Sequence, residues 1–105
     1  MKIAIAVNNK DQNSQISERA GRASHYLIFD EKGKALGDIS NPFLEERGGA
    51  GTATAEMLAD KGISVVIAGD FGRKMTDALE NRGVRYYKEE GSVEEVLKKV
   101  TIFKK

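Results

Sequence analysis

Short apolar runs separated by polar turns predict five strands. Residues 2–7 and 63–68 are almost continuously apolar, which is typical of strands buried on both faces of a sheet. Residues 24–30 and 34–40 flank the turn signal Glu31-Lys32-Gly33, so we expect them to form a hairpin. Residues 84–87 form a fifth, shorter run.

Helical spacing of apolar residues predicts three helices. The first covers residues 50–61, with Ala50, Ala53, Met57 and Leu58 on its inward face. The second covers residues 73–82, and Met75, Ala78 and Leu79 are its inward residues. Ser92 and Glu95 match a capping box at the start of a third helix, in which Val93, Val96, Leu97 and Val100 follow helical spacing. No element is assigned to residues 101–105.

The order of these elements favours one topology. Helical crossovers make the first, fourth and fifth strands parallel, and the second strand must run antiparallel to its hairpin partner. If the second strand also pairs antiparallel with the first, the third strand is parallel to the first. A right-handed crossover then places the fourth strand on the free side of the first. We therefore expect a single α/β domain over residues 1–105, with a five-stranded mixed sheet of order 3-2-1-4-5 and helices packed on it. This order resembles the ribonuclease-H-like arrangement.

That topology brings three loops to one edge of the sheet. They are the long polar loop of residues 8–22, the glycine stretch of residues 48–51 and the turn of residues 69–72. Open α/β sheets bind ligands at this carboxyl edge. Two helix N-termini point into the expected crevice, and their free N–H groups favour an anion. The arginines in or beside these loops are Arg19, Arg22, Arg47 and Arg73.

Composition and charge exclude several classes of function. The 105 residues include no cysteine, so disulfides and thiolate metal sites are excluded. The 17 basic and 16 acidic residues give a net charge of +1, too small an excess for a general nucleic-acid surface. No apolar run has membrane-spanning length and no signal-peptide pattern is present. We expect a soluble, cytoplasmic protein without a nucleic-acid or membrane partner.

Catalytic constellations are also missing from the sequence. Two-metal phosphoryl chemistry needs clustered carboxylates, whereas Asp11, Glu18 and Asp70 are scattered over loops and Asp30 ends a strand at the far edge. No serine lies in a nucleophile-elbow pattern. His25, the sole histidine, starts the second strand. A lone histidine is more often a packed or surface residue than a metal ligand. We therefore expect His25 to be a packed or surface residue, with metal ligation as the alternative. We predict that the protein is not an enzyme.

Several motifs, taken in order, carry a family resemblance. They are the run of residues 17–23 (Ser-Glu-Arg-Ala-Gly-Arg-Ala), Asn41-Pro42, the glycine stretch, and residues 65–69 followed by Gly72. From residue 1 to about residue 100 the chain resembles the dinitrogenase iron–molybdenum cofactor biosynthesis family, which includes small NifX-like carriers and the C-terminal domain of NifB. The resemblance implies the ribonuclease-H-like fold and a non-catalytic role in carrying iron–sulfur or iron–molybdenum clusters. It also implies cofactor-assembly proteins as partners.

The chain departs from the family pattern at two histidines. Arg19 stands where the family often has histidine, and Ala20 stands where it often has an aromatic residue. Arg47 lies in the region of a second family histidine, just ahead of the glycine stretch. Arginine is not an ordinary metal ligand but binds anions through its fork of donors. Three alternatives therefore stay open: the site holds an anionic cluster by its outer sulfides, it holds another anion, or it holds no ligand.

These considerations define one candidate site and two functions. The candidate ligand-binding residues are Asn8, Arg19, Gly21, Arg22, Arg47, Gly48, Gly49, Gly51, Thr52, Gly69 and Gly72. The first function is that of a cluster carrier. The alternative is a small interaction or regulatory domain of the same fold that has lost cluster binding. The identity of the ligand, the pathway and the oligomeric state stay open at this point.

Overall fold

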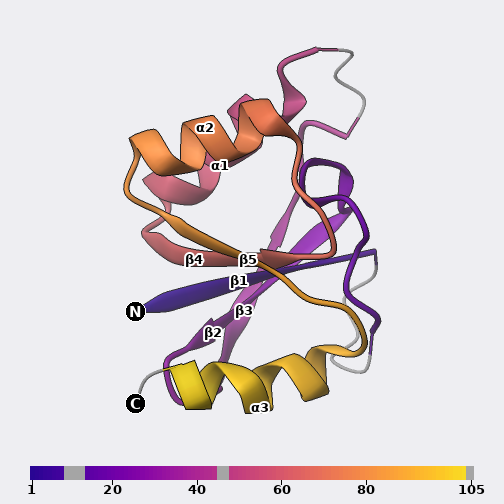
Figure 1. Cartoon of the computed structure of the whole chain (residues 1–105), viewed down its shortest axis with the longest axis vertical. Coiled ribbons are helices and arrows are strands. Elements are labelled where there is room, and N and C mark those ends of the chain that lie inside the picture. The colour runs from indigo at the N-terminus through magenta and orange to yellow at the C-terminus, as the bar shows by residue number, and fades with distance from the viewer. Residues whose placement is uncertain (9–13, 45–47, 104–105) are drawn as a thin grey trace.

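The expected five strands and three helices form a three-layer arrangement in a computed structural model (Figure 1). The structure describes residues 1–8, 14–44 and 48–103, with the backbone alone for residues 100–103. The elements are β1 (Lys2–Val7), the 3₁₀ turn η1 (Ala20–Arg22), β2 (His25–Asp30), β3 (Ala35–Ser40), α1 (Ala50–Asp60), β4 (Ile63–Ala68), α2 (Arg73–Asn81), β5 (Arg85–Lys88) and α3 (Val93–Phe103).

The sheet has the predicted order, β3-β2-β1-β4-β5. β2 pairs antiparallel with both β1 and β3, whereas β1 pairs parallel with β4 and β4 parallel with β5. β1 lies at the centre, and all its residues after Lys2 are buried. The predicted fold is therefore confirmed, and so is the common edge at which β1, β4 and β5 end.

Two cores lie on opposite faces of the sheet. α1 and α2 cover one face and α3 covers the other (Figure 1). Side chains alternate along β1, so Ala4 and Ala6 lie under α1 and α2 while Ile3, Ile5 and Val7 face α3. The alanines take up little room beneath the helix pair, and the larger side chains fill the space on the face with a single helix.

Local differences from the prediction have tertiary causes. On α1 the fully buried residues are Ala50, Thr54, Ala55 and Leu58. Ala53 and Met57 are half-buried, and Met57 packs against the same core. α1 also contacts α2, and the pattern did not predict the burial of Thr54 and Ala55. The sequence pattern also missed η1 and the continuation of α3 through Phe103. Among the described residues, no helix is long and apolar enough to span the bilayer.

Candidate functional site

The segment after β1 crosses the carboxyl edge of the sheet and carries Arg19 to the end of β4. The Ser17 N–H donates to the Ala6 carbonyl at 2.7 Å, and the Ser17 carbonyl accepts from the Gly69 N–H at 2.8 Å. Three residues after Ser17, the Ala20 N–H donates to the Asp70 carbonyl at 2.9 Å. These bonds tie the residue 17–20 segment to the ends of both β1 and β4, so the first and third predicted loops do meet.

This crossing requires glycine at position 69. A Cβ there would lie 2.9 Å from the Glu18 Cα and 3.2 Å from the Ser17 carbonyl oxygen. Carbon atoms do not approach backbone atoms so closely without displacing them. Gly69 therefore has a packing role, and it lines a different hollow, beside Lys88 and Glu89.

Close backbone contacts also join η1, α1 and α2. A Cβ on Gly21 would lie 3.3 Å from the Gly51 Cα, and a Cβ on Gly51 would lie 3.1 Å from the Met75 Cβ. The two glycines let the three segments approach without a side chain between them. The residues of this contact, Gly21, Gly51 and Met75, line a pocket that the three segments share.

The pocket has a volume of about 420 Å³. It is lined by Arg19, Ala20, Gly21, Arg22, Gly49, Ala50, Gly51, Asp70, Phe71, Gly72, Arg73, Lys74 and Met75. The lining comes from three loops far apart in sequence, at the edge where β1 and β4 diverge to opposite sides of the sheet. This is the crevice that the predicted topology places there.

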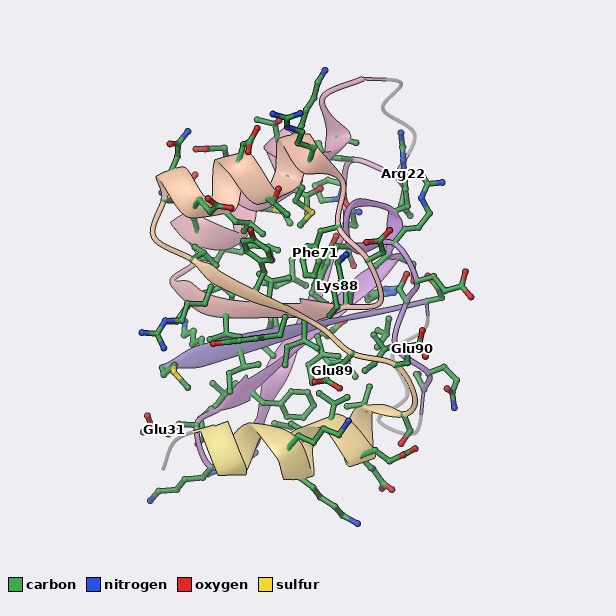
Figure 2. All side chains as sticks on the ribbon, in the orientation of Figure 1. Arg22, Glu31, Phe71, Lys88, Glu89 and Glu90 are labelled. Carbon is green, nitrogen blue, oxygen red and sulfur yellow. The ribbon has the colours of Figure 1, made fainter. Side chains whose placement is uncertain are left out.

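Positive side chains dominate the lining. Arg19, Arg73 and Lys74 are exposed and form no ion pair with any carboxylate in the described part of the chain. Arg22 reaches across from η1 and donates from Nη1 to the Leu44 carbonyl at 2.9 Å (Figure 2). The wall of the pocket therefore presents four cationic side chains.

Asp70 is the acidic residue among the lining residues. Its Oδ1 lies 3.1 Å from Nζ of Lys88 at the end of β5. The hydrogen bond from Lys88 is the largest cause of a lowered pKa of Asp70, followed by a bond from the Phe71 backbone. Asp70 is therefore ionised at neutral pH, and its charge is offset by Lys88 from outside the pocket.

The helix N-termini at the pocket have no side-chain caps. Gly49 precedes α1 with φ +74°, and Gly72 precedes α2 with φ −71°; neither helix has a side-chain cap or an acidic residue in its first turn. At α3, away from the pocket, the Ser92 Oγ accepts from the Glu95 N–H at 3.2 Å. The chain thus caps the distant helix itself and leaves the first N–H groups of α1 and α2 for another acceptor.

A buried tyrosine supports η1 from below. Tyr26 is fully buried on β2, and its hydroxyl donates to the Ala20 carbonyl. Burial raises the pKa of Tyr26 well above its usual value, opposed by the Thr54 hydroxyl. The phenol therefore keeps its proton and its hydrogen bond to η1.

The predicted site residues fall into three groups. Those that line the pocket are Arg19, Gly21, Arg22, Gly49, Gly51 and Gly72, and those that do not are Asn8, Gly48, Thr52 and Gly69. Arg47 lies outside the described residues. Asn8 and Thr52 are exposed, at the end of β1 and in the first turn of α1.

Among the described residues, His25 neither lines the pocket nor belongs to a group of metal-ligating side chains. Its Nδ1 lies 2.9 Å from the Ser24 hydroxyl, and it does not line the pocket. No group of three or more His, Cys, Asp or Glu side chains suited to a metal ion occurs within the described ranges. The pocket therefore presents hydrogen-bond donors and positive charge in place of metal ligands.

The sequence pattern did not single out Lys74 and Met75 as lining residues, whereas Phe71 lies in the turn that was expected at the crevice. Lys74 could have been found, because the first turn of a helix that starts at the crevice faces it. The position of Met75 follows only from how α2 packs on α1. Tyr26, which is buried beneath η1, carried no signal in the sequence pattern, and Asn41 stood out only within the Asn41-Pro42 motif of the family resemblance, with no role assigned to it.

Comparison with known proteins places this site in a family context. Residues 1–101 match the protein family described as dinitrogenase iron-molybdenum cofactor. The chain belongs to that family. The predicted resemblance is therefore confirmed, and the match spans both arginine-bearing loops and the glycine stretch.

Solved structures share the whole fold. The apo form of the orange protein from Desulfovibrio gigas aligns with a TM-score of 0.86 at 25% identity, covering 93% of this chain and 84% of that one. A proposed NifB protein from Thermotoga aligns with a TM-score of 0.76 at 31% identity, covering 92% and 84%. An uncharacterized protein of Methanocaldococcus jannaschii is 28% identical over 91 residues, which are 84% of this chain and 74% of that protein.

Proposed function

We propose that the protein is a non-catalytic carrier that binds an anionic iron–sulfur or iron–molybdenum type cluster, or a precursor of one, in the pocket between η1, α1 and α2. The observation that carries the proposal is the convergence of two uncapped helix N-termini with four cationic side chains on one pocket. The iron-molybdenum cofactor in the family's description supports a metallocluster over an unrelated anion, and the likeness to a proposed NifB protein agrees with it.

The first turn of α2 supports an anionic ligand independently. Arg73 and Lys74 are its first two residues. Positive charge at a helix N-terminus is unfavourable, because it adds to the positive end of the helix dipole. An anion bound between these side chains and the free N–H groups would replace this repulsion with attraction.

The chemistry of the donors determines how such a cargo is held. The chain has no cysteine, so the metals receive no thiolate from it. Guanidinium groups of Arg19, Arg22 and Arg73, with backbone N–H groups at Gly51 and Arg73, can donate hydrogen bonds to outer sulfides or oxygens. A cargo bound in this way is not covalently attached and can be passed to another protein.

Anaerobic reconstitution with iron, sulfide and molybdate tests this function. We expect a stoichiometric cluster absorbance in the wild type and at least about a tenfold weaker uptake in Arg19→Gln/Arg73→Gln, because two charge-assisted contacts are lost. Arg85→Gln is the matched control, since Arg85 is an exposed arginine at the start of β5, at the opposite edge of the sheet. High salt should weaken uptake as well.

A second candidate is an interaction or regulatory domain that has lost the cluster. The arginine at position 19, where the family often has histidine, favours it. If the folded wild type takes up no cluster under these conditions, or the double variant binds as well as the wild type, the carrier proposal is wrong and this candidate is preferred.

A further inference from the structure

Asn41, immediately after β3, is a buried polar residue that joins two segments of the pocket wall. Its side chain is 6% exposed. Nδ2 donates to the Ala23 carbonyl at 2.9 Å and to the Gly21 carbonyl at 3.2 Å, and Oδ1 accepts from the Phe43 N–H at 2.9 Å. Only an amide side chain supplies two donors and an acceptor at this length.

These bonds surround Arg22. The two carbonyls that Asn41 binds belong to the residues on either side of Arg22 in the chain. Asn41 accepts a hydrogen bond from the Phe43 N–H. The next residue, Leu44, provides the carbonyl that accepts a hydrogen bond from the Arg22 guanidinium. The backbone and the guanidinium of Arg22 are thus both held by structure that Asn41 organises, while Asn41 itself does not line the pocket.

We infer that Asn41 is the positioning residue of the anion pocket: it fixes the η1 turn, and with it Arg22, against the start of α1 before the ligand arrives. A ligand that meets an already ordered arginine loses less conformational entropy on binding. Without the amide, two carbonyls lose their donor and the turn gains freedom to move. This role rests on the proposed anion binding, but it also predicts that the η1 turn is already held in place in the free protein.

The variant to test is Asn41→Ser, which can still accept from the Phe43 N–H but cannot reach both carbonyls. Thr54→Val is the matched control, because Thr54 is a fully buried polar residue of α1 that does not line the pocket and bonds neither of the carbonyls that Asn41 binds. With tetrathiomolybdate as the probe, equilibrium dialysis should give a dissociation constant roughly five- to tenfold higher for Asn41→Ser and within about twofold of wild type for Thr54→Val.

A double-mutant cycle separates positioning from a general loss of stability. In an Arg22→Gln background, Asn41→Ser should change the dissociation constant by less than about twofold, because the residue through which it acts is gone. Equal affinity of Asn41→Ser and wild type, or an undiminished effect in the Arg22→Gln background, would overturn the inference. If the serine variant does not fold, Asn41→Asp keeps the side-chain shape and the acceptor and enters the same cycle.

Hydrogen exchange of the free protein tests the positioning without any ligand. The Arg22 N–H donates to the Arg19 carbonyl at 3.1 Å, and in Asn41→Ser its exchange should become at least about fivefold faster, while amides of β1 and β4 are unchanged. Unchanged exchange at Arg22 would refute the inference. If wild type does not bind tetrathiomolybdate, cargo binding loses support, and the exchange experiment still decides the role of Asn41.

Discussion

Replacing Gly69 with alanine should destabilise the fold more than any other glycine substitution at the pocket edge. The added Cβ would stand 2.9 Å from the Glu18 Cα and 3.2 Å from the Ser17 carbonyl oxygen. Both neighbours are backbone atoms, so no side-chain rotation relieves the contact. The Ser17 carbonyl is also the acceptor for the Gly69 N–H, at 2.8 Å, and moving it weakens that bond.

The size of the effect follows from three contributions. Crowding in a packed site costs about 1–3 kcal/mol. Weakening the Gly69–Ser17 bond and the adjacent Ala20–Asp70 bond costs about 1 kcal/mol each. Restricting the unfolded chain returns about 0.5–1 kcal/mol. The net loss is about 2–4.5 kcal/mol, and at about 4 °C per kcal/mol the Tm should fall by about 8–18 °C.

Thermal and urea unfolding followed by circular dichroism measure this loss. The urea midpoint should fall while the slope stays constant, because the surface exposed on unfolding does not change. Gly48→Ala is the control: a Cβ at Gly48 meets no atom within 4 Å, and its stability should stay within about 0.5 kcal/mol of wild type. A Gly69→Ala protein that melts with the wild type would refute the packing role.

Three further predictions concern the pocket floor and its charges. Gly51→Ala should cost about 1–3 kcal/mol in urea unfolding, because its Cβ would lie 3.1 Å from that of Met75. Tyr26→Phe should cost about 1–2 kcal/mol by removing the bond to η1. Because burial raises the pKa of Tyr26 above 10.0, its contribution is complete below about pH 10 and is lost at higher pH, where the unfolded chain ionises first. As the pH is raised from about 8 to about 11, the free energy of unfolding should therefore fall less for Tyr26→Phe than for wild type. Asp70→Asn should bind tetrathiomolybdate a few-fold more tightly at low salt, since Lys88 then adds an uncompensated charge; equal or weaker binding would contradict the assigned sign of the pocket.

The main features of the fold could be derived from the chain alone. Continuous apolar runs at residues 2–7 and 63–68 predicted buried strands, and the two ends of each were correct. The boundaries of α1 and α2 were predicted to within one residue at the end and correctly at the start. Periodicity and the handedness of crossovers are local or topological rules, so they hold without knowledge of packing.

The candidate site was predicted less completely. The topology places three loops at one edge of the sheet. Arg19, Arg22 and four of the predicted glycines, Gly21, Gly49, Gly51 and Gly72, do line one pocket there. Gly69 was assigned to the ligand but packs against Glu18. The sequence pattern cannot distinguish these cases, because a glycine next to a ligand and a glycine next to a backbone have the same local signature.

The sequence by itself determined which segments form strands and helices, how the strands are ordered and which loops share an edge. These properties depend on the spacing of apolar residues and on chain handedness. Only the tertiary structure decided that Asn41 holds both sides of Arg22, that Lys88 offsets Asp70, and that Gly21 and Gly51 make room for close packing. Each of those contacts joins residues at least 18 positions apart, and distances of about 3 Å between such residues are fixed only when the whole chain has packed.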